Sequence, residues 1–107
     1  MNKNFLKQAQ QMQAQISKAQ AELTEMRTEG SAGGGAVKVV LVGGSTLESI
    51  QISPEAVDPE DVEILQDLIV AAVNNAVTTA QHQTSEKMSS ITGGLNVPGL
   101  GGLPGFS

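Results

Sequence analysis

Apolar residues recur at alternating spacings of four and three along the first part of the chain. This apolar seam consists of Phe5, Ala9, Met12, Ile16, Ala19, Leu23 and Met26. The spacing is typical of a coiled coil and no glycine or proline interrupts it, so it predicts a helix over residues 3–29. Such a helix would be roughly 40 Å long, whereas strands of the length that follows reach only about 20 Å. Part of the seam is therefore expected to contact another helix or another subunit.

The middle of the chain has the pattern of a β-hairpin. Residues 36–42 are mostly β-branched, residues 43–46 form a glycine-rich turn, and residues 47–52 alternate between apolar and polar. The alternation predicts an antiparallel pair with one buried face, on which Ile50 and Ile52 lie. The glycine-rich run 30–35 is expected to end the first helix. An alternative interpretation makes Arg27 to Ala32 a short edge strand that leads into the sheet.

A second helix is predicted from Asp58, with Asp58 as N-cap and Pro59 at the first helical position. Apolar residues keep helical spacing from Val62 to Ala80, and the helix becomes polar beyond that point and should project outward before ending near Gly93. About half of its circumference is apolar, more than one hairpin covers, so a second subunit is expected to cover the rest. The candidate interface residues are Val62, Leu65, Leu68, Ile69, Ala72, Val73 and Ala76.

Length and composition indicate one domain over residues 1–91, followed by a tail, 92–107, whose glycines and prolines predict flexibility. The 107-residue chain has no cysteine, which excludes disulfides and thiolate metal sites and fits a reducing cytoplasm. It also lacks the roughly 18 consecutive apolar residues of a membrane span. We therefore expect a cytoplasmic protein that does not enter the membrane.

The net charge of −5 is unevenly distributed along the sequence. Residues 1–20 carry +3, from Lys3, Lys7 and Lys18, while residues 54–70 carry −6. The chain thus joins a basic helix tip to an acidic middle. An acidic protein is a poor general binder of polyanions, but a locally basic tip can still bind one.

No constellation of residues predicts catalysis, a cofactor or a metal site. The glycine run 30–35 lacks the lysine of a phosphate-binding loop and joins a helix to a strand, the reverse of that loop's context. His82 has no cluster of other metal ligands around it and is expected to be a solvated helix residue. The acids of 55–67 are explained by the positive end of a helix dipole. We therefore expect no enzyme and no small-molecule substrate.

The remaining candidate binding residues are cationic: Lys3, Lys7, Lys18, Arg27 and Lys87. Their density is also that of an ordinary solvated helix face. Because the chain has almost no aromatic residues, it offers no platform for stacking single-stranded bases. A bound nucleic acid would therefore be held by its phosphates, and dimerisation would bring two tips to one duplex.

The order of the segments resembles the YbaB/EbfC family of bacterial nucleoid-associated proteins, over about Phe5 to Leu100. After the Gln- and Met-rich helix come EGSAGGGAVKV (29–39), IQISPE (50–55), DPED (58–61), LQDLIVAAVNNA (65–76), and Met88 followed by TGGL (92–95). The string DLIxAAxNxA over residues 67–76 is especially specific, and the apolar stripe assigns it to packing or dimerisation.

The resemblance implies an α+β fold: a long N-terminal helix, a small antiparallel sheet of about three strands and a long C-terminal helix, assembled as a tweezer-like homodimer. It implies a protein of the cytoplasmic nucleoid that binds duplex DNA with little sequence preference and affects nucleoid organisation and gene expression. The acidic middle departs from a typical DNA binder. The alternative function is a protein-interaction module that uses the exposed seam of residues 5–26 without binding DNA directly.

Overall fold

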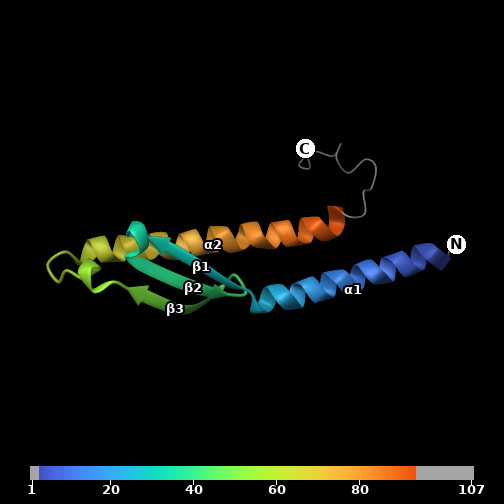
Figure 1. Ribbon diagram of the computed structural model, residues 1–107, viewed down its shortest axis with the longest axis horizontal. Coiled ribbons are helices and arrows are strands. Elements are labelled where there is room, and N and C mark those ends of the chain that lie inside the picture. Colours follow the sequence, from blue (N-terminus) through green and yellow to red (C-terminus); the bar gives the residue numbers. More distant parts are fainter. Residues whose placement is uncertain (1–2, 94–107) are drawn as a thin grey trace.

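The computed structural model describes residues 3–93 and has the predicted α+β architecture (Figure 1). A long helix precedes a three-stranded antiparallel sheet of order β1-β2-β3, and a second long helix follows it. The predicted tail lies outside the described residues beyond Gly93. The elements are α1 (Lys3–Glu25), β1 (Arg27–Ala32), the single turn η1 (Gly33–Gly35), β2 (Val37–Val42), β3 (Thr46–Ile52), the single turn η2 (Pro54–Ala56) and α2 (Val62–Gly93).

The first helix ends earlier than the sequence pattern predicts. It stops at Glu25, and Arg27–Ala32 forms edge strand β1, which pairs antiparallel with Val37–Val42. The prediction of a helix to residue 29 is therefore wrong, and the alternative edge-strand interpretation is confirmed. Thr28 and Gly30 are poor helix formers, and in the strand both are buried against α2. Tertiary packing thus decides the conformation of this segment.

One face of the sheet packs against α2, and the core lies between them. Three β2 residues and two α2 alanines form its fully buried part, which consists of Val37, Val39, Leu41, Ala72 and Ala76. The alanines allow the helix axis to approach the sheet closely. Half-buried side chains of α2 surround this core.

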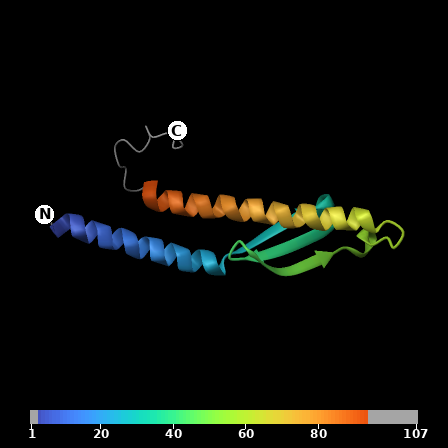
Figure 2. The ribbon, with the colours of Figure 1, turned by 180° about the vertical axis from the view of Figure 1, so that it is seen from behind.

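Strand β3 is left uncovered by α2, which packs against β1 and β2 (Figures 1 and 2). Ile50 pairs with Val39 and Ile52 with Val37, so both isoleucines share the face of the sheet that carries the core. The prediction that Ile50 and Ile52 lie on the same face of the sheet is confirmed. However, Ile50 is 40% exposed and Ile52 is 37% exposed. The prediction that this face of β3 is buried is therefore wrong for the single chain.

The second helix begins later than predicted, at Val62. A turn precedes it, in which the Asp58 side chain accepts a hydrogen bond from the Glu60 N–H (3.0 Å) and the Asp58 carbonyl accepts one from the Asp61 N–H (3.0 Å). Pro59 follows Asp58, and its fixed φ suits the second position of such a turn. Asp58 therefore closes a turn ahead of the helix instead of capping the helix itself.

The two helices extend from the same end of the sheet. The polar C-terminal half of α2 projects beyond the strands, as predicted, and lies beside α1 (Figures 1 and 2). α1 continues past the end of α2. The radius of gyration, 19.8 Å, exceeds the roughly 13 Å of a compact chain of this length. Much of α1 therefore lies outside the core.

Candidate nucleic-acid interface

Three of the predicted cationic residues lie on one exposed face of α1. We call Lys3, Lys7 and Lys18 the lysine stripe; all three side chains are exposed. At 3.6 residues per turn they fall within a sector of about 60° and span about 22 Å along the axis. The apolar seam lies on roughly the opposite side of the helix. α1 therefore presents a cationic face and an apolar face in different directions.

Arg27 is engaged by a carboxylate on the opposite edge of the sheet. Its Nε and Nη2 atoms donate hydrogen bonds to Glu48 Oε2 and Oε1, both at 2.9 Å. These bonds and the opposite charges lower the pKa of Glu48 and raise the pKa of Arg27. Because the bidentate pair joins β1 to β3 across β2, its evident role is to tie the edge strands together. A phosphate that binds Arg27 through the same two nitrogens would have to displace Glu48.

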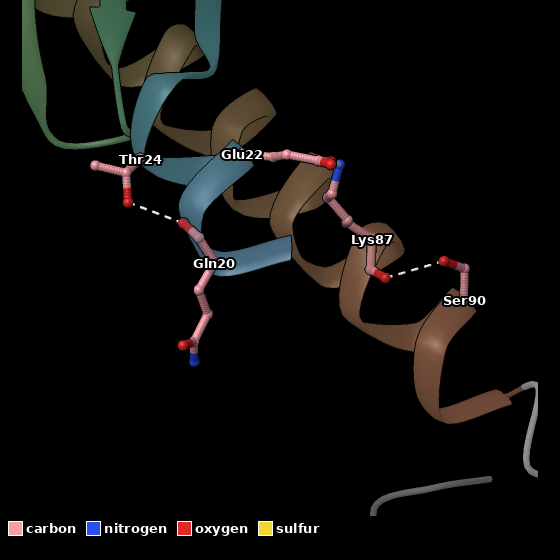
Figure 3. Close-up of polar contacts among 5 residues, drawn as sticks. All are labelled: Gln20, Glu22, Thr24, Lys87 and Ser90. Atoms are coloured by element: carbon pink, nitrogen blue, oxygen red, sulfur yellow. Dashed lines mark hydrogen bonds and ion pairs between the residues drawn. The ribbon is translucent and has the colours of Figure 1, made fainter. Parts of the chain in front are cut away.

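Lys87 is engaged by Glu22, and this ion pair links α2 to α1 (Figure 3). The hydrogen bond from Lys87 and its charge lower the pKa of Glu22, and Lys18 adds a smaller effect in the same direction. Nearby, the hydroxyl of Ser90 donates to the Lys87 carbonyl (3.0 Å). Two of the five predicted cations are thus paired with carboxylates more than twenty residues away in sequence. By contrast, within residues 3–93 the lysine stripe makes no ion pair.

Charge is separated along the length of the subunit. The lysine stripe belongs to the helix that carries the N-terminus, whereas η2 and the start of α2 lie at the opposite end of the molecule (Figures 1 and 2). Six exposed carboxylates gather at that opposite end: Glu55, Asp58, Glu60, Asp61, Glu63 and Asp67. A polyanion would therefore be attracted to one end of the subunit and repelled from the other.

The rest of the described surface offers no arrangement for metal binding. His82 is largely exposed, and its Nε2 lies 3.1 Å from Glu86 Oε1, one helical turn away. In residues 3–93 no three His, Cys, Asp or Glu side chains are placed to hold a metal ion. Neither α1 nor α2, as far as the structure describes them, is long and apolar enough to cross a membrane.

The predicted dimer-interface residues fall into three groups. Ala72 and Ala76 have no exposed surface in the single subunit, so they belong to its own core, which corrects the expectation that they contact a second subunit. Val62 is 50% exposed. The remaining residues are half-buried and pack around the core: Leu65, Leu68, Ile69 and Val73.

Sequence reasoning missed the exposed apolar side of β3, which comprises Leu47, Ile50 and Ile52. A simple geometric signal would have found it. A helix is about 10 Å wide and neighbouring strands are about 4.8 Å apart, so one helix covers two strands. A three-stranded sheet with one helix must therefore leave one strand without a cover.

Comparisons with known proteins agree with this fold. The model of the YbaB/EbfC DNA-binding family matches residues 1–95. The chain is 54% identical over 97 residues to a nucleoid-associated protein of Alkaliphilus metalliredigens, covering 91% of this chain and 85% of that protein. It is 52% identical over 103 residues to a nucleoid-associated protein of Acetivibrio thermocellus, covering 96% and 87%.

A solved structure shares the fold. It is the crystal structure of an uncharacterized protein from Helicobacter pylori, which superimposes with a TM-score of 0.67 at 19% identity. The match covers 86% of this chain and 98% of that one. The order of elements, the sequence match and the shared fold lead to one assignment: this chain belongs to the YbaB/EbfC DNA-binding family.

Proposed function

We propose that the protein is a nucleoid-associated homodimer that binds duplex DNA through the phosphate backbone, using the lysine stripe of α1. The main support for this proposal is the position of the three lysines on one exposed face of α1. The acidic residues of η2 and the start of α2 lie at the opposite end of the molecule. The names of the relatives, which are nucleoid-associated proteins, support it. Binding along DNA would affect nucleoid organisation and gene expression by occupancy, without catalysis.

The chemistry of the stripe favours phosphate contact over base readout. Lysine ammonium groups act as point charges that suit phosphate oxygens, and the stripe contains no arginine for bidentate contact with guanine. Neutralising phosphates releases counterions, so log K falls with log salt by about 0.9 per phosphate. A dimer carries six stripe lysines, which predicts a slope of about −5 if all of them contact phosphates. Affinity should depend little on sequence.

The proposed dimer covers the exposed apolar side of β3. The Ser31 N–H donates to Asn75 Oδ1 (3.1 Å), which marks the side of α2 that faces β1. By helical geometry, Val73 and Val77 lie on the other side of α2, toward β3. Both are half-buried, and they continue the apolar surface formed by Leu47, Ile50 and Ile52. A second copy of the chain that packs against this apolar surface would complete the core of both subunits.

A charge substitution on β3 tests the dimer. Ile50→Glu places a carboxylate on the proposed interface, while Ser49→Glu places the same group on the next residue, which faces the opposite side of the sheet. At the low end of the micromolar range, where seam pairing is not expected, sedimentation equilibrium should show a folded monomer for Ile50→Glu and a dimer for Ser49→Glu. A dimer that survives Ile50→Glu at that concentration would place the interface elsewhere.

A charge reversal on α1 tests DNA binding. Lys7→Glu should weaken binding to duplexes of unrelated sequence by a similar factor, measured by fluorescence anisotropy at low salt. Lys38→Glu is the matched control, because Lys38 is also exposed but lies in β2, away from α1. Equal losses for the two variants, or no binding by the wild-type protein at low salt, would refute the proposal.

A second candidate function is a protein-interaction module without direct DNA contact. Phe5 is 62% exposed and Leu6 is 52% exposed on α1, which favours a helix-binding partner. Pull-down of a partner that survives nuclease treatment, together with no binding of duplex DNA, would select this function.

A further inference from the structure

The apolar seam of α1 becomes progressively exposed toward the N-terminus. Ala19 is 3% exposed, Ile16 and Met12 are half-buried, and Phe5 is 62% exposed. The cause is visible in Figures 1 and 2, where α1 extends beyond the end of α2. Within residues 3–93, the first turns of α1 have no element to cover their apolar side.

α2 meets α1 along one flank of the seam. The shallow groove between the two helices is lined on the α1 side by Gln15, Lys18, Ala19 and Glu22, and on the α2 side by Lys87, Ser90 and Ile91. The Glu22–Lys87 ion pair closes this flank (Figure 3). By helical geometry, Phe5 and Met12 point about 80° away from the middle of this flank. The uncovered part of the seam is therefore an apolar surface distinct from the α1–α2 contact.

The residues that border the uncovered seam are neutral. Gln8 and Gln15 lie along one side of it and Gln13 along the other, while the lysine stripe lies on the opposite face of the helix. DNA phosphates would find no cation on this face, and an acidic or basic partner would find no charge complement. Two copies of the same seam, however, can meet without like-charge repulsion.

Because the cationic and apolar faces lie on opposite sides of α1, insertion of Phe5 into DNA is also excluded. Apolar wedges that kink DNA act beside cations that hold the flanking phosphates. Here Phe5 points away from Lys3 and Lys7 by more than about 150° around the helix. If the lysine stripe contacts the phosphates, Phe5 faces away from the duplex.

We propose that residues 3–16 of α1 pair seam to seam with the same segment of a second copy, through a contact separate from the interface on β3. Each segment is about 20 Å long, and the pairing buries Phe5, Ala9 and Met12 on both helices. Because α1 projects beyond α2, the paired tips join two dimers end to end. The lysine stripes of both dimers then face outward, where they can contact one long duplex or bridge two.

Sedimentation of the full chain without DNA, at high salt and across micromolar concentrations, tests this pairing. The wild-type protein should pass from dimer to tetramer as its concentration rises. Phe5→Gln/Met12→Gln, which keeps helix propensity but makes the seam polar, should remain a dimer. Ala14→Gln is the matched control on the exposed lysine side of α1 and should behave like the wild type.

Two results would overturn the proposal. One is a wild-type protein that stays dimeric at every concentration. The other is a Phe5→Gln/Met12→Gln variant that falls to monomer, since the seam would then form the basic dimer itself. The Ile50→Glu variant separates this proposal from the dimer on β3, because its monomers should still pair through their seams at high concentration. Loss of all association in Ile50→Glu would be a third result against the proposal, because the seam would then not pair independently.

Discussion

The backbone of Gly30 in β1 crosses Ala76 in α2 so closely that no side chain fits between them. A methyl group built on Gly30 would lie 2.5 Å from the Ala76 Cβ, and 2.5 Å from the carbonyl oxygen of Ala72. Real contacts of this kind are never that short. The crossing therefore sets the distance between α2 and the sheet, and with it the position of the helices that project from the sheet.

Gly30→Ala should destabilise the protein by about 3 kcal/mol, because either the backbone of α2 or that of β1 must move. Gly34→Ala is the control: Gly34 has a positive φ of 67° but nothing within 4 Å of an added Cβ. The free energy of unfolding of this control should fall by only about 1 kcal/mol, which is the cost of placing alanine at a positive φ. Urea unfolding followed by circular dichroism measures both, and equal losses would contradict the close crossing.

Acidification should weaken the contact between α1 and α2. Lys87 holds the pKa of Glu22 below its ordinary value of 4.5. A carboxyl with a lowered pKa stabilises the folded state above its ordinary pKa, and this contribution is lost as the pH falls through the lower, folded-state value. Arg27 likewise lowers the pKa of Glu48, so the pair between β1 and β3 should also weaken at low pH.

The Glu22→Gln variant isolates this effect. Above pH 4.5 the wild-type protein should melt at a slightly higher temperature than the variant, and the difference should shrink as the pH is lowered further. The pair is on the surface, so high salt should also reduce the difference. A difference in melting temperature that stays constant with pH would show that the ion pair does not contribute.

Arg27 should contribute little to DNA affinity, although it is one of the cations in the sequence prediction. Its guanidinium is bound by both oxygens of Glu48. Arg27→Gln should therefore leave the affinity for duplex DNA close to that of the wild-type protein, while Lys7→Gln lowers it. Comparable losses for the two variants, measured by anisotropy in the same buffer, would mean that DNA displaces Glu48.

Local patterns were sufficient to predict most of the fold. Six of the seven seam positions lie in α1, which their heptad spacing indicates, and the β-branched run 37–42 indicates β2. The conformation of 26–32 could not be predicted from local preference alone, because the pairing with Val37–Val42 and the contact of Gly30 with α2 determine it. The exposure of Ile50 likewise depends on how many strands one helix covers.

The candidate site was predictable only in part. The sequence places Lys3, Lys7 and Lys18 on a helix, and their common face follows from their spacing. The pairing of Lys87 with Glu22, however, joins residues 65 positions apart. No local pattern reports such a contact, because it depends on how α2 lies against α1.

The change in salt dependence caused by removing the lysine stripe tests the central claim most directly. Duplex binding of the wild-type protein and of Lys3→Gln/Lys7→Gln/Lys18→Gln should be measured over a range of salt concentrations at a fixed pH. We predict that the slope of log K against log salt decreases in magnitude by about 5 in the variant dimer, since six phosphate contacts are lost. A variant whose slope equals that of the wild-type protein would contradict the assignment of the stripe as the DNA-binding surface.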